Sequence, residues 1–308
     1  MTCLSIRHTV GSRALDWLDK EYARFDVFQD LVADHPNEAR QTAVCELALG
    51  MLILNRHRCL VGDDRVIRLA ECLARICQHP SFHRYVFEGH PLAFTGHLIT
   101  WLALDALKCP LPISRDRMQG LAETDRILRA HRTPFRTMEL RYFLDWGRFR
   151  HTLPDYPALF SQTCLACLEP PPSSFTLEDV YEVTHLVLYL TDFGLRLPTF
   201  LDTAGIRRIV DLLLACLEML VELHHWDLVA EVLLSLQCLG VDSGVEVERG
   251  WRALYEAQDV TGAIFEGPSG DRLQPASIEL APSEFLALYH RSLVAVLAAF
   301  VGRGEETS

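Results

Sequence analysis

Apolar residues recur every three or four positions along almost every segment of this chain, which is the period of an amphipathic α-helix. The sustained alternation of apolar and polar residues that marks a half-buried strand is absent from the sequence. The pattern therefore predicts an all-α protein of about twelve helices. We place them at residues 12–25, 37–57, 63–79, 91–108, 114–131, 135–149, 156–168, 176–193, 202–225, 227–239, 243–257 and 282–301.

The helix with the clearest ends covers LEDVYEVTHLVLYLTDFG, from Leu177 to Gly194. Thr176 is a good N-cap residue, and an Asp follows three positions later, as in a capping box. Gly194 suits the left-handed turn that ends many helices. On one side of the helix, polar residues follow at helical spacing: Glu182, His185, Tyr189 and Asp192. At about 100° per residue these four share one stripe, which is either a solvated face or the wall of a site.

Most of the predicted loops are short, so consecutive helices are expected to pack as antiparallel hairpins. About six hairpins would form an α/α toroid or a superhelical stack, and we predict a single α/α-toroid domain over residues 1–301. The triple proline at 170–172 could instead divide two helical halves. The long loop 258–281 is expected to be functional. Residues 302–308 are expected to form a disordered tail.

Isolated polar residues lie on the more apolar helices, which alternate along the chain with more polar ones. In an α/α toroid, alternate helices form an inner ring that is buried on nearly all sides. A polar side chain there must find a hydrogen-bond partner or face the central cavity. The residues concerned are Glu46, His97, Glu139, Asp145, His185, Gln237 and His290. They favour a cavity with polar groups in an apolar wall, and a structural hydrogen bond is the competing interpretation for each.

The composition argues against several classes of protein. A net charge of −12 without a basic stripe disfavours nucleic acid and anionic membrane surfaces as partners. We find no signal peptide and no apolar run near the roughly 18 residues that span a membrane, so we expect a cytoplasmic protein without membrane insertion. The ten cysteines lie mostly in apolar helices and fit reduced core thiols. The basic residues are almost all Arg, which is typical of a GC-rich, actinobacterial-type genome.

No complete catalytic motif occurs in the sequence. It lacks a phosphate-binding P-loop, a dinucleotide-binding glycine pattern and a nucleophile elbow. The single Cys-x-x-Cys, Cys164 with Cys167, has no second pair at metal-binding spacing and indicates two core cysteines. Glu-x-x-His, a spacing used in di-metal helical bundles, occurs at 182–185 and again at 222–225. The second pair lies opposite the apolar arc of its helix, which indicates a solvated face.

The last part of the chain resembles a known group of folds. The helix FLALYHRSLVAVLAAF, preceded by the loop AQDVTGAIFEGPSGD, is similar to the final helical pair of α/α-toroid proteins, among them protein prenyltransferase β subunits and terpenoid cyclases. The stretch EVTHLVLYLTDFG also resembles an all-helical actinobacterial family. The resemblance implies a toroid fold and matches His290 to a zinc-binding histidine. The Asp-x-Cys, Asp-x-Asp-Asp, Asp-Asp-x-x-Asp and Trp-Cys-His-Gly motifs of such enzymes are absent from this sequence.

These observations fit an enzyme with a central apolar cavity, acting in bacterial secondary metabolism on a hydrophobic small molecule or a modified peptide. Its chemistry would be acid–base or metal-assisted, of the cyclisation or lyase type. We predict His185 as the acid–base residue, oriented by Glu182 and Asp192. The predicted substrate-binding residues are Glu46, His97, Trp101, Tyr189 and His290.

A divalent metal ion held by His185 and His290 is the cofactor that this hypothesis allows. The alternative hypothesis is a non-catalytic helical scaffold that binds a protein partner. It is favoured by the missing catalytic motifs. Both hypotheses leave assembly into a homo-oligomer open.

Overall fold

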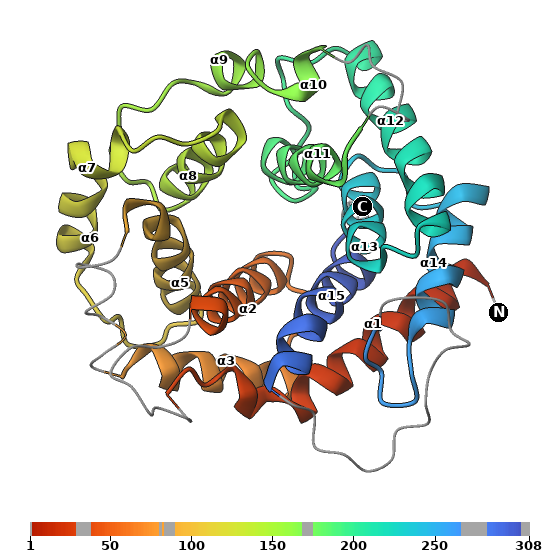
Figure 1. Ribbon diagram of the computed structural model, residues 1–308. Helices are drawn as coiled ribbons and strands as arrows, with labels where there is room; N and C mark the ends of the chain where they lie inside the picture. The colour runs from red at the N-terminus through yellow and green to blue at the C-terminus, as the bar shows by residue number, and fades with distance from the viewer. Residues whose placement is uncertain are drawn as a thin grey trace, which may run out of the picture. The chain divides into compact units, whose positions relative to one another are not determined.

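The computed structural model describes residues 2–28, 38–79, 82, 90–167, 175–265 and 282–302. Over these residues the chain is helical, with fourteen α-helices, two short 3-10 helices and no strand (Figure 1). The all-α prediction is therefore confirmed. The chain separates into two compact units: unit 1 contains Met1–Arg24 and Leu168–Ser308, and unit 2 contains Phe25–Cys167.

Unit 2 is built on α2 (Glu38–Arg56), α5 (Phe94–Ala106) and α8 (Pro134–Trp146). Helix α5 packs on both α2 and α8, and most of its residues are buried. This matches its sequence, in which His97 and Asp105 are the only ionisable residues. The other elements are α3 (Asp64–Cys77), η2 (Pro91–Ala93), α6 (Arg115–Ala122), α7 (Asp125–Leu128), α9 (Tyr156–Phe160) and α10 (Cys164–Cys167). The short helix η1 (Tyr22–Phe25) belongs to unit 1 except for its last residue, Phe25.

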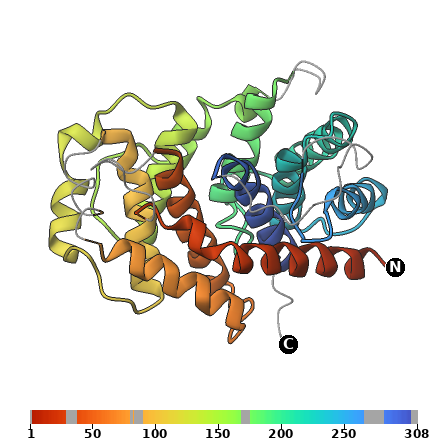
Figure 2. The same ribbon diagram turned by 60° about the horizontal axis from the view of Figure 1, so that its bottom comes forward.

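Unit 1 has α13 (Trp226–Cys238) as its central helix. It packs on α11 (Leu177–Leu190), α12 (Thr203–Glu222), α14 (Val245–Ala257) and α15 (Pro282–Phe300). Every residue of α13 except Asp227 is buried. Helix α1 (Cys3–Lys20) packs along α15, as the red and blue helices in Figures 1 and 2 show.

Helix α11 begins where the sequence predicts and ends earlier. The Thr176 hydroxyl accepts a hydrogen bond from the Asp179 N–H, and the Asp179 carboxylate accepts one from the Thr176 N–H, so the capping box is confirmed. After Leu190 the chain leaves the helix. Asp192 and Phe193 both have φ of 53° before Gly194 at 88°. Asp192 therefore lies beyond the helix, which corrects the predicted four-residue stripe on its surface.

Two predicted helices are each broken in two. Residues 114–131 form α6 and α7, and residues 156–168 form α9 and α10. Each break contains a Thr whose hydroxyl donates to the carbonyl three residues earlier: Thr124 to Leu121, and Thr163 to Phe160. Such local bonds compete with the helical ladder. The first helix also starts at Cys3, ahead of its predicted beginning.

Only the first part of the predicted functional loop belongs to the described residues. There the Asp259 carboxylate accepts hydrogen bonds from the N–H groups of Thr261 and Ala263, and the Gln258 amide donates to the Val10 carbonyl. The chain turns tightly at Gly262, where an added Cβ would lie 2.1 Å from the Arg13 carbonyl oxygen. The rest of the loop, the triple proline and residues 303–308 of the expected tail lie outside the described residues.

Among the helices that the structure describes, one is long and apolar enough, by length and composition, to cross a membrane. It is the window Ser283–Phe300 of α15, of which 61% is buried inside the protein. Glu284 and Arg291 interrupt its apolar run, so the sequence pattern alone did not predict a membrane span there. A buried core helix passes the same test, and α15 packs on both α1 and α13.

Candidate metal centre

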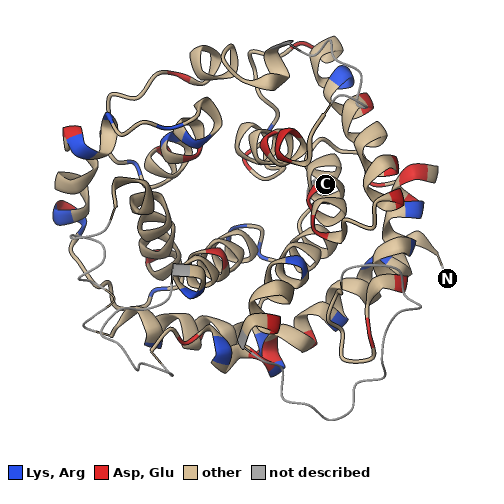
Figure 3. Ribbon diagram, in the orientation of Figure 1, with Lys and Arg blue, Asp and Glu red and all other residues tan. Residues whose placement is uncertain are grey.

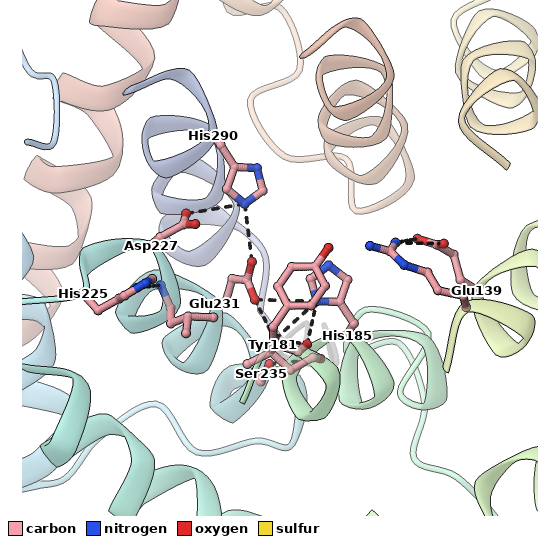
Figure 4. A network of polar contacts seen from close by, with 11 residues as sticks. Glu139, Tyr181, His185, His225, Asp227, Glu231, Ser235 and His290 are labelled. Carbon is pink, nitrogen blue, oxygen red and sulfur yellow. Dashed lines mark hydrogen bonds and ion pairs between the residues drawn. The ribbon is translucent and has the colours of Figure 1, made fainter. Parts of the chain in front are cut away.

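A buried carboxylate lies at the centre of unit 1. The side chain of Glu231, on α13, is only 3% exposed. Its Oε2 accepts a 2.6 Å hydrogen bond from the Thr184 hydroxyl and lies 3.6 Å from His185 Nδ1. Its Oε1 lies 3.4 Å from Nε2 of His290 on α15 (Figure 4). Because a buried charge is costly unless it is paired, these contacts from α11 and α15 explain how an apolar helix tolerates Glu231.

A second carboxylate lies one helical turn earlier on the same face of α13. Asp227 Oδ1 is 3.4 Å from His290 Nε2, the same distance that separates this nitrogen from Glu231. The Asp227 Oδ1 atom is buried and has no hydrogen-bond partner among the described residues. Asp227, Glu231 and His290 each offer one ligand atom, and these three atoms lie within 4.8 Å of one another. We call these residues the Asp-Glu-His cluster.

The spacing within the Asp-Glu-His cluster resembles that of a metal coordination sphere. Ligand atoms at about 2.0–2.1 Å from a tetrahedral ion lie about 3.3–3.4 Å from one another. The two distances from His290 Nε2 have this length, which is long for a strong hydrogen bond. Three protein ligands also leave a position open for water or substrate, as in catalytic zinc sites.

His185 borders the cluster with a defined orientation. Its Nδ1 lies 2.9 Å from the Tyr181 carbonyl oxygen, which can only accept a hydrogen bond. In the neutral ring Nδ1 therefore carries the proton, and Nε2 presents a lone pair. The Tyr181 ring covers the imidazole, with 3.9 Å between ring centroids. The Ser235 hydroxyl, which donates to the Thr184 carbonyl, ties this part of α11 to α13.

The two carboxylates differ in their electrostatic surroundings. Burial raises the pKa of Asp227, the nearby His290 lowers it and the charge of Glu231 raises it again, so that it ends above its ordinary value. Burial also opposes the ionisation of Glu231, but the attraction of His185 and His290 and the Thr184 hydrogen bond outweigh it, and the pKa of Glu231 lies below its ordinary value. Glu231 is thus the permanent charge of the cluster, and Asp227 takes up a proton more readily.

A sequence model described as Domain of unknown function (DUF6895) matches residues 11–300. The chain belongs to this family. No curated protein and no solved structure gives a significant match. The comparisons thus show the DUF6895 family, and they show neither the toroid families nor the terpenoid cyclases that the sequence resembles. The matched span contains all the residues of the Asp-Glu-His cluster.

Two of the predicted site residues of this DUF6895 chain meet at the cluster. His185 and His290 contact opposite oxygens of Glu231. Of the two residues predicted to orient His185, Glu182 is half-buried on α11, and the buried Asp192 lies 3.7 Å from the Arg196 side chain. Tyr189 is buried beside His185, with 6.1 Å between ring centroids. Glu231, which contacts both histidines, is a residue that the sequence analysis did not name.

The other three predicted substrate-binding residues belong to unit 2. Glu46 is half-buried on α2. His97 is buried on α5 against the Phe82 ring, and this burial lowers its pKa to about 4. The Trp101 indole donates a 3.0 Å hydrogen bond to the Ile113 carbonyl. The contacts of Trp101 and His97 are those of core residues.

Sequence reasoning missed both carboxylates of the cluster. Glu231 is the only charged residue in the stretch LVAEVLLSLQC, the same signal that drew attention to Glu46. In that helix the analysis named Gln237 instead, which donates a hydrogen bond to the Ala298 carbonyl. The second Glu-x-x-His pair does not join the cluster. Glu222 is exposed and pairs with Arg249, and the His225 side chain caps α13.

Proposed function

We propose that this protein is a metal-assisted enzyme in which Asp227, Glu231 and His290 hold a divalent cation. The observation that carries the proposal is the position of His290 Nε2, 3.4 Å from one oxygen of each carboxylate. The buried Asp227 Oδ1, which has no hydrogen-bond partner among the described residues, supports it because a cation would satisfy that atom.

The same geometry suggests a division of roles. A cation with three protein ligands can polarise a substrate oxygen or lower the pKa of a bound water. His185 Nε2, left with its lone pair by the Tyr181 contact at Nδ1, can take up or deliver a proton. We retain the substrate class expected from the sequence, a hydrophobic small molecule or modified peptide in bacterial secondary metabolism, with a cyclisation or lyase-type reaction. The apolar character of α11, α13 and α15 supports this choice.

An α/α toroid is the arrangement that we propose for the whole chain. The support is that long helices pack on each other across the helices that lie between them in the sequence. In unit 2, α2 packs on α5 and α5 packs on α8, and in unit 1, α11 packs on α13 and α13 packs on α15. In a toroid such contacts join the helices of the inner ring. An experimental structure in which these helices do not close into one ring would contradict this part of the proposal.

A structural role is the competing function, and one observation favours it. Glu231 accepts a hydrogen bond from Thr184 and lies 3.4 Å from His290, so the cluster can also serve as a buried polar network that fixes α11, α13 and α15. A helical scaffold that binds a protein partner needs no more than that.

Metal content of the purified full-length protein separates the two functions. We expect close to one divalent ion per chain by elemental mass spectrometry, retained in Glu222→Gln, an exposed carboxylate outside the cluster. The ion should be lost in Asp227→Asn, a change that leaves the buried Glu231 and its partners in place. A native protein that neither contains metal nor binds added zinc, manganese or magnesium in calorimetry would leave only the structural role.

A further inference from the structure

Unit 2 contains a cavity of about 390 Å³ between η2 and the first turn of α8. The polar residues around it are Thr95, His131, Arg132, Thr133, Arg136 and Glu139. An adjoining cavity of about 400 Å³ shares His131 and adds Arg126 and Arg129. Both cavities are formed within this one unit, and neither contains a residue of the Asp-Glu-His cluster.

Arg132 is a fixed positive charge in the wall of the first cavity. Its guanidinium donates to the backbone carbonyls of Ile127 at 2.6 Å and Pro91 at 2.9 Å. These partners hold the side chain in place but carry no net charge. Among the described residues no carboxylate lies within ion-pair distance of Arg132; burial lowers its pKa, and the more distant charge of Glu139 partly opposes this effect. A half-buried guanidinium held in this way attracts an anion more strongly than a mobile surface arginine does.

The beginning of α8 adds a second favourable element. Thr133 is the N-cap of this helix of 13 residues, and its side chain makes no capping hydrogen bond. The hydroxyl can therefore donate to a bound group. The positive end of the helix dipole lies at the same place, and helix N-termini of this kind bind phosphate.

The charges around the two cavities are positive in sum. Four arginines line them, against the carboxylates of Asp125 and Glu139. Each carboxylate already has an arginine partner: Glu139 pairs with Arg136, and Asp125 with Arg129. Figure 3 shows the basic and acidic positions that lie on α7 and α8. A positive site is unusual in a chain whose net charge is −12.

We propose that this cavity binds the phosphate or diphosphate group of a small molecule. The anion would accept hydrogen bonds from the Arg132 guanidinium and the Thr133 hydroxyl at the start of α8, with His131 at the entrance. The volume exceeds that of a phosphate group, which leaves room for the organic part of the molecule. This site is separate from the proposed metal centre and does not depend on it.

The decisive variant is Thr133→Asp, tested on the full-length protein. Asp is at least as good an N-cap as Thr, so α8 should keep its stability. The new carboxylate, however, places a negative charge where the phosphate should bind. Thr2→Asp is the matched control, because it makes the same change at the N-cap of α1 in unit 1.

Binding of inorganic pyrophosphate and of inorganic phosphate is measured by calorimetry at constant ionic strength. We expect pyrophosphate to bind the wild type and Thr2→Asp alike, and roughly tenfold or more weakly to Thr133→Asp at an unchanged melting temperature. Arg132→Gln should weaken binding to a similar degree. Absence of pyrophosphate binding to the wild type, or equal binding to Thr133→Asp, would overturn the proposal. Binding of pyrophosphate but not phosphate would identify the diphosphate as the group recognised.

Discussion

At the scale of single residues, Glu231 shows how a buried charge organises its surroundings. It is almost fully buried, and three side chains from α11 and α15 approach its two oxygens. Removing a partner would leave a charge uncompensated in the core, which usually costs several kcal/mol. The residue therefore fixes the positions of both histidines, whether or not a cation is bound.

The two histidines should differ in their effect on metal binding. His290 offers Nε2 to the proposed cation, whereas His185 contacts Glu231 through Nδ1 and acts only on the orientation of a ligand. We expect His290→Gln to abolish binding of zinc, and His185→Gln to weaken it by about 10–100-fold, as for other residues that orient metal ligands. Calorimetric titration of both variants tests this. Equal loss in both would make His185 a direct ligand, as the sequence analysis proposed.

His97 should make the protein sensitive to acid. Its burial lowers the pKa from 6.5 to about 4. The unfolded chain therefore binds a proton at His97 at a higher pH than the folded chain does. The contribution of His97 to the free energy of unfolding is thus complete above about pH 6.5. It is lost as the pH falls towards 4, which lowers the free energy of unfolding by about 3 kcal/mol. Leucine cannot bind a proton, so we expect His97→Leu to remove this part of the pH dependence. The substitution should be tolerated because Nδ1 of His97 has no hydrogen-bond partner among the described residues.

Urea unfolding at pH 7, 5.5 and 4.5 measures this effect. The control is His8→Gln, which removes an exposed imidazole and should keep the sensitivity of the wild type. The same loss of stability in His97→Leu as in the wild type would mean that other groups cause the acid sensitivity.

At the scale of helices, the close approach of α1 and α15 depends on a glycine. A Cβ added at Gly11 would lie 2.2 Å from the Cβ of Ala299, and Arg7 Nε donates a 2.8 Å hydrogen bond to the Ala299 carbonyl at the same contact. Glycine is intrinsically unfavourable within a helix, so its presence here is explained by packing.

Two helical glycines should respond to substitution with opposite signs. We expect Gly11→Ala to lower the free energy of unfolding by about 1–3 kcal/mol, because α1 and α15 must move apart. Gly120→Ala in α6 should raise it by about 0.5–1 kcal/mol, because nothing lies within 4 Å of the added Cβ and alanine favours the helix. Denaturant unfolding of both variants measures the difference. A stabilising Gly11→Ala would show that α1 and α15 do not pack this closely.

Helical periodicity and capping residues were sufficient to predict the fold class and the start of α11. The end of α11 shows why the positions of the site residues were harder to predict. Asp192 follows the helical spacing of Glu182, His185 and Tyr189, but the helix ends at Leu190 and the backbone of Asp192 is left-handed, so Asp192 does not lie on the helix face. The site depends on helices that are distant in sequence. Thr184 and His290 lie 47 and 59 residues from Glu231. Nothing in the local pattern of α13 indicates which helices will supply its partners.

At the scale of the whole molecule, the two proposed sites belong to different compact units. Each ligand should therefore stabilise one unit. We expect zinc to slow amide hydrogen exchange in α11, α13 and α15, and pyrophosphate to slow it in η2, α7 and the start of α8.

Exchange followed by mass spectrometry, with Asp227→Asn and Thr133→Asp as respective controls, distinguishes these patterns. Protection by zinc in α8, or by pyrophosphate in α13, would show instead that the units are energetically coupled.

The division of unit 1 into two separate stretches has a consequence for how the protein is made. Helix α1 is translated long before its partner: 292 residues separate Arg7 from Ala299. At a translation rate of about 5–20 residues per second, roughly 15–60 s pass between the synthesis of α1 and that of α15, and all of unit 2 is synthesised in this interval. Until its two partner helices, α14 and then α15, are synthesised, no helix covers its apolar face, which includes Val10, Leu15 and Trp17. Nascent chains of this protein should therefore need a chaperone at α1 until translation ends.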